Sequence, residues 1–96
     1  LMLSWDDVLV KAASIVTRES GDELVVVLPE QGKYVVLNAT GARVLRLADG
    51  KHTLHEIVDA IVVEFGADPA QVERDVLRFA QSLVERDALV AIKHNA

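Results

Sequence analysis

The sequence has no cysteine, few aromatic residues, and no apolar run close to the ~18 residues that a membrane-spanning helix needs. Without cysteine the chain forms neither disulfides nor thiolate metal sites, so a cytoplasmic location is expected. The first residues also lack the basic-then-apolar order of a signal peptide. Hydrophobic residues make up 51% of the chain and aromatic residues only 4%, so the core must be mostly aliphatic. This composition excludes a disordered chain.

The length and the net charge limit the organisation and the partners. A chain of 96 residues forms one domain, because smaller pieces would not bury enough surface to fold. With a net charge of −5 the chain gains nothing from counterion release at phosphates, which makes nucleic acid a poor partner. A peptide with some basic residues suits this charge better.

The first third of the chain is rich in strand-forming residues. Residues 14–19, 23–28 and 33–37 predict an antiparallel meander of three strands, with turns at Gly21-Asp22 and at residues 29–32. Residues 4–12 fit either a helical turn capped by Ser4 or an extended segment. The meander ends with residues 33–37, so this strand is expected to be a sheet edge.

Helix signals dominate the rest of the chain. A first helix is predicted over residues 40–48. Asn38 and Thr40 are expected to bond the free backbone N–H groups at its start, and Gly50 to be its left-handed C-cap. A second begins at a capping box of Thr53 and Glu56 and ends at Gly66, and a third begins at Asp68-Pro69. Residues 89–92 are expected to form a short terminal strand or tail. The expected fold is α+β and winged-helix-like, with a three-stranded antiparallel sheet followed by three helices.

The sequence contains no recognisable catalytic set. His55-Glu56 begins like the zinc motif H-E-x-x-H, but Asp59 stands where the second histidine belongs, and the capping box already explains Glu56. No serine lies in a Gly-x-Ser-x-Gly elbow and no glycine cluster forms a phosphate loop. We therefore expect no enzyme activity, no cofactor and no metal.

The strand at residues 33–37 is apolar on both faces and leaves open what covers it. Leu77 and Val84 of the third helix lie off that helix's main apolar stripe, so strand and helix together would form a groove. The N-terminal segment, residues 1–13, could close the groove as a flexible or swapped piece. A second copy could also cover it as a strand-swapped dimer, the alternative to a monomer. The third possibility is a peptide that adds as an extra strand.

Several of these elements together resemble a known family. The stretch GKYVVLNATGARVLRLADGKHTLHEIVDAI, followed by VERDVLRFAQSLVERDALV, is similar to the PqqD-like proteins. These are precursor-peptide recognition domains of pathways that make peptide natural products, including quinone-cofactor and lasso-peptide pathways. The resemblance runs from about Ile15 to Ile92 and rests on the order and spacing of many positions.

The resemblance implies a small adaptor without catalytic activity, a single domain over residues 1–96. It would bind the leader region of a precursor peptide by strand addition and present it to a modifying enzyme or a leader peptidase. By position, the leader would contact the third strand and the third helix. The implied peptide-binding residues are Lys33, Tyr34, Val35, Val36, Leu37, Arg74, Asp75, Leu77, Arg78 and Gln81.

Two other functions remain open from the sequence. The second and third helices are joined by Gly66-Ala67-Asp68, as in the helix pair of a winged-helix DNA-binding regulator. The third helix carries more acidic than basic residues, and this charge would repel phosphate. The other alternative is a module that dimerises through the strand edge.

Overall fold

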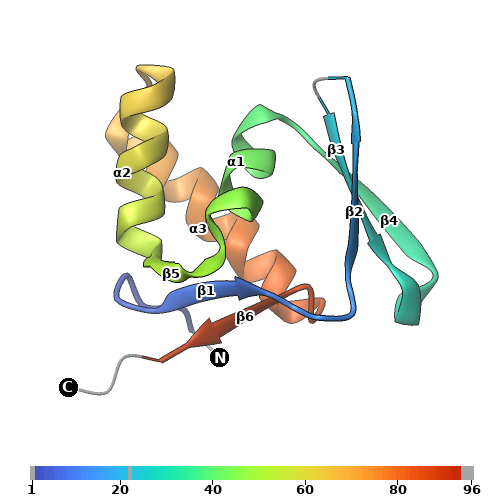
Figure 1. The fold of residues 1–96 in the computed structure, drawn as a ribbon. Coiled ribbons are helices and arrows are strands. Elements are labelled where there is room, and N and C mark those ends of the chain that lie inside the picture. Colours follow the sequence, from blue (N-terminus) through green and yellow to red (C-terminus); the bar gives the residue numbers. More distant parts are fainter. Residues whose placement is uncertain (1, 22, 94–96) are drawn as a thin grey trace.

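The computed structural model describes residues 2–21 and 23–93 as a mixed α+β domain (Figure 1). The elements follow in this order: β1 (Val8–Lys11), β2 (Val16–Ser20), β3 (Glu23–Leu28), the short 3-10 helix η1 (Pro29–Gln31), β4 (Lys33–Leu37), α1 (Ala39–Leu47), β5 (Asp49–Thr53), α2 (Leu54–Phe65), α3 (Pro69–Glu85) and β6 (Leu89–Ile92).

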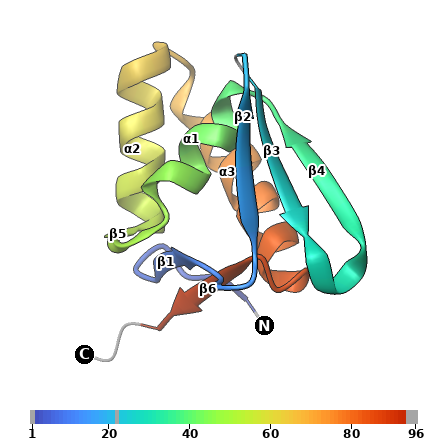
Figure 2. The ribbon, with the colours of Figure 1, turned by 45° about the vertical axis from the view of Figure 1, so that its right-hand side comes forward.

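The strands form two separate antiparallel sheets. One has the order β2-β3-β4 and is the predicted meander; the other has the order β5-β1-β6 and joins both ends of the chain. Figures 1 and 2 show α1 and α3 between α2 and the β2-β3-β4 sheet, with the second sheet across one end of the helices. The expected α+β fold with three helices is confirmed, and the second sheet is an addition to it.

The helices begin where their capping residues predicted. The side chains of Asn38, Thr53 and Asp68 each accept a hydrogen bond from a backbone N–H in the first turn of α1, α2 and α3. The capping box is complete, because the Glu56 side chain also accepts from the Thr53 backbone at 2.8 Å. Gly66 ends α2 in the left-handed conformation at φ 60°.

The first helix ends close to where it was predicted to end, but its predicted C-cap was wrong. Helix α1 ends at Leu47 with Ala48 as its C-cap, and Gly50 instead lies within β5 at φ 82°. Strand β5 itself was not expected, because Asp49–Thr53 has a polar sequence without strand preference. Its pairing with β1 makes it a strand.

The N-terminal segment is extended and does not cover β4. Strand β1 pairs with β5 and β6 across one end of the helices, away from the β4 edge (Figure 1). Its position is fixed by hydrogen bonds such as Leu54 N–H to the Asp7 carbonyl at 2.9 Å. Strand β1 therefore does not cover the β4 edge, although Met2 and Leu3, which precede it, reach Leu77 of α3.

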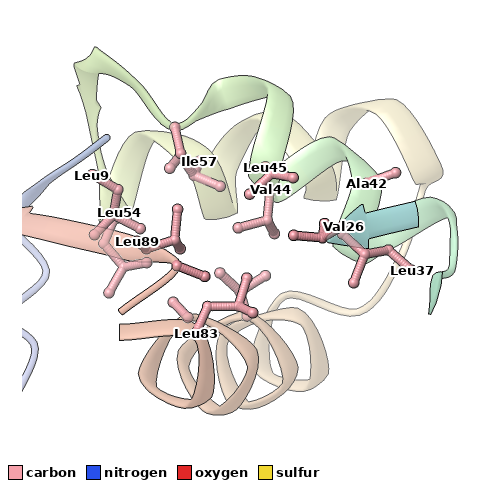
Figure 3. Packing of buried hydrophobic residues seen from close by; sticks show 14 of the residues in the cluster. Leu9, Val26, Leu37, Ala42, Val44, Leu45, Leu54, Ile57, Leu83 and Leu89 are labelled. Atoms are coloured by element: carbon pink, nitrogen blue, oxygen red, sulfur yellow. The ribbon is translucent and has the colours of Figure 1, made fainter. Parts of the chain in front are cut away.

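One aliphatic core joins both sheets and all three helices (Figure 3). Leu9, Val26, Leu45, Ile57 and Val76 are each 0–1% exposed and come from five different elements. Burial of this apolar surface, at about 25 cal/mol per Å², stabilises the frame that holds β4 and α3 in place. Within the described ranges, no helix is long and apolar enough to cross a membrane.

Candidate functional site

Strand β4 is an open sheet edge, as the sequence predicted. It pairs with β3 on one side, in a register that sets Val35 opposite Val26 and Val36 opposite Val25. In the part of the chain that the structure describes, no strand pairs with its other side. An open edge presents a row of N–H and C=O groups that a further strand can bind.

The two faces of β4 have different surroundings. Leu37 is buried and Val35 is half-buried, and both pack toward the core beneath α1. Tyr34 and Val36 point the other way and are 71% and 47% exposed. They continue an apolar outer face that includes Val16 at 49% exposure, and no described element covers it. The second apolar face noticed in the sequence is thus left uncovered by the residues that the structure describes.

One flank of α3 meets the chain segments just before and just after β4. Gln31, in the turn before β4, donates from Nε2 to the Arg86 carbonyl at the end of α3 over 2.5 Å. At the other end, Phe79 and Asp75 of α3 meet the start of α1 around Gly41. A hollow of about 160 Å³ opens there, lined by Asn38, Thr40, Gly41, Val44, Asp75, Val76 and Phe79.

The opposite flank of α3 carries a second hollow, of about 350 Å³. Four of the five helix residues implied by the family resemblance line it together with two N-terminal residues: Arg74, Leu77, Arg78, Gln81, Met2 and Leu3. The fifth, Asp75, lies at the first hollow, where it accepts a hydrogen bond from the Gln71 side chain at 2.9 Å.

The structure also brings residues to the β4 side of α3 that the implied set lacks. Phe79 and Arg86 follow Asp75 by four and eleven residues, a spacing that keeps all three on one helical face. That spacing was available from the sequence. The N-terminal segment was one of the expected covers of Leu77, and Met2 and Leu3 do lie there. The sequence did not indicate which residues of the segment would reach α3, because this contact joins opposite ends of the chain.

The histidines do not form a metal site within the described ranges. His52 pairs through Nδ1 with Asp49 at 2.9 Å, and this hydrogen bond lowers the pKa of Asp49. His55 lies 3.7 Å from Asp59, one turn along α2. Among described residues, no three His, Cys, Asp or Glu side chains gather as metal ligands would.

Known proteins share this sequence pattern and this fold. The family model described as "Coenzyme PQQ synthesis protein D (PqqD)" matches residues 23–89. A PqqA binding protein of Gluconobacter oxydans (strain 621H) is 34% identical over 68 residues, which cover 71% of this chain and 69% of that protein.

Two solved structures have similar folds. TbiB1 in complex with the TbiA(beta) leader peptide superposes with a TM-score of 0.76 at 30% identity, covering 88% of this chain and 99% of that one. The second is the PqqD truncation of Methylobacterium extorquens PqqCD, which superposes with a TM-score of 0.75 at 27% identity. It is described as a functional, stand-alone recognition element for ribosomally synthesised, modified peptides. It covers 92% of this chain and 94% of that one. The matched residues include β3, β4 and all three helices, and they show that the chain belongs to the PqqD family.

Proposed function

We propose that this chain is a non-catalytic adaptor that binds the leader region of a precursor peptide and presents it to a modifying enzyme or a leader peptidase. The observation that carries the proposal is the open edge of β4 beside α3. A relative of the same fold, TbiB1, was solved in complex with a leader peptide.

Strand addition at β4 would supply most of the affinity through backbone hydrogen bonds, which do not depend on the leader's side chains. Backbone groups of Lys33–Leu37 would pair with those of the leader, as in other complexes formed by β-augmentation. Side chains along the added strand would alternate between two environments. One set would face α3 near Asp75 and Phe79, and the other would lie beside Tyr34 and Val36 on the outer face.

The proposed peptide-binding residues fall into two groups in space. Lys33, Tyr34, Val35, Val36 and Leu37 form the edge itself, and Asp75 lies at the hollow between α3 and the start of α1, which follows β4 in the chain. Arg74, Leu77, Arg78 and Gln81 lie around the other hollow. A leader that contacts both groups would pair with β4 and then cross the outward surface of α3.

The proposal predicts the strength of leader binding. About four to six backbone hydrogen bonds contribute on the order of 1 kcal/mol each, and two apolar anchors about 1.5–3 kcal/mol each. Ordering the free peptide costs about 1 kcal/mol or more per residue. The net free energy of binding predicts a dissociation constant roughly between nanomolar and tens of micromolar.

Isothermal calorimetry with the precursor encoded beside this chain's gene tests the prediction. A peptide of the same composition in scrambled order is the control for non-specific attraction to an acidic protein. Binding only in the millimolar range, or equal binding of the scrambled peptide, would refute the proposed function.

A further inference from the structure

We propose that the hollow on the far flank of α3 is a second recognition site, which takes an apolar leader side chain that has a carboxylate close to it in sequence. Met2 and Leu3 of the N-terminal arm, residues 2–4, form one wall of this site. The inference rests on the proposed function and adds to it the chemistry of the segment that the leader must carry.

The floor and walls of the hollow are mainly apolar. Leu77 of α3 and Leu3 of the arm are both half-buried and pack against the core. Met2 is 86% exposed at the rim, so the hollow is open to an incoming side chain. At about 350 Å³ the hollow has room for a large aliphatic or aromatic side chain.

Two arginines at the rim give the hollow an unbalanced positive charge. Among the described residues, Arg78 forms no ion pair or hydrogen bond, and Arg74 bonds only the uncharged Gln71 side chain, at 2.9 Å. By contrast, Arg43 and Arg46 each pair with a glutamate. In a chain of net charge −5, two guanidinium groups without carboxylates beside an apolar hollow favour a ligand that supplies a carboxylate.

The arm is fastened from the other end of the chain. Lys93 donates from Nζ to the Met2 carbonyl at 2.6 Å and to Asp7 Oδ2 at 2.7 Å, and Ser4 N–H donates to the same carboxylate at 2.9 Å. Asp7 is only 1% exposed. Burial raises its pKa, but the hydrogen bonds from Lys93 and Ser4 outweigh this effect and hold the pKa below its usual range. The carboxylate therefore stays charged at neutral pH and ties Ser4 of the arm to Lys93 near the other end of the chain.

The distance across α3 limits where the motif lies in the leader. A helix is about 10–12 Å wide with its side chains, and an extended chain advances about 3.3 Å per residue. The apolar residue and its neighbouring carboxylate should therefore lie about three or four residues beyond the segment that pairs with β4.

Calorimetry with the cognate leader tests the site through Arg78. We expect Arg78→Gln to weaken leader binding about tenfold, while Arg78→Lys retains most of the affinity because it keeps the charge. Arg18→Gln is the matched control, since it removes one exposed arginine from β2 at the opposite edge of the sheet. Melting temperatures should be unchanged in all three variants.

The leader and the arm supply two further comparisons. Replacing the leader's carboxylate by its amide should weaken binding to the wild-type protein about tenfold, as Arg78→Gln does. The same replacement should hardly change the affinity of the Arg78→Gln variant, because in a double-mutant cycle two groups in direct contact are not additive. Lys93→Met should weaken binding several-fold by releasing the arm. Lys51→Met, which removes an exposed lysine from β5, should have no effect.

The outcomes separate this inference from the proposed function. If wild type binds the leader and Arg78→Gln binds it as Arg18→Gln does, the second site is refuted and the adaptor function stands. A tightly bound leader with no apolar-acidic pair would also refute the site. If wild type binds no leader, the proposed function fails and this inference fails with it.

Discussion

Proline at the residue of β4 whose N–H points to the open edge should abolish leader binding while the domain still folds. Proline removes the backbone donor, and its ring blocks the approach of an added strand. We expect the dissociation constant to rise at least about tenfold, with a loss of stability smaller than that of a proline inside the β3–β4 ladder.

Two neighbouring substitutions identify that residue, because successive N–H groups of a strand point to opposite sides. We expect one of Val35→Pro and Val36→Pro to lose binding with a modest fall in melting temperature. The other should unfold more readily because it breaks a bond to β3. The pair Thr17→Pro and Arg18→Pro on β2, the other edge strand, provides the control and should leave leader affinity intact wherever the protein folds. Wild-type affinity in both β4 variants would exclude strand addition at this edge.

Gly41→Val should destabilise the domain by about 1–3 kcal/mol, the usual cost of overpacking a well-filled contact. A Cβ at this position would lie 3.1 Å from Cζ and 3.3 Å from Cε1 of Phe79, so α1 and α3 would have to separate or the ring would have to move. For a domain of this size the melting temperature should fall by roughly 4–8 °C per kcal/mol.

A control variant and a second-site substitution separate the effect of this contact from the lower helix propensity of valine. Ala39→Val places the same residue at an exposed position in the first turn of α1 and should cost only a few tenths of a kcal/mol. Phe79→Leu should recover part of the loss when combined with Gly41→Val, because the shorter side chain leaves room for it. Equal melting temperatures for Gly41→Val and Ala39→Val would show that the approach of Phe79 to Gly41 does not constrain the fold.

Local chemistry explains which parts of the fold the sequence predicted. The capping side chains at Asn38, Thr53 and Asp68 act within three residues of themselves, so their roles could be read without knowing the tertiary structure. The meander was equally local, since short turns join its strands. Strand β5 could not be predicted in this way, because Asp49–Thr53 becomes a strand only through pairing with β1, far away in sequence.

The candidate site was also predictable from the sequence only in part. The apolar strand and its place at the end of the meander predicted the edge, and the sheet order confirmed it. The helix residues were harder, because spacing indicates which residues share a face of α3 and not which face lies toward β4. The packing of Phe79 on Gly41 decides that, and it places Asp75 on the β4 side, away from the hollow shared by Leu77 and Arg78.

Amide hydrogen exchange along Lys33–Leu37, measured residue by residue with and without the leader, tests the central claim most directly. Strand addition predicts that the leader slows exchange at every second amide of β4, those that face the open edge. The amides of β2, at the other edge of the sheet, should exchange as before. Unchanged exchange along β4 in a complex that calorimetry shows to be saturated would contradict the account.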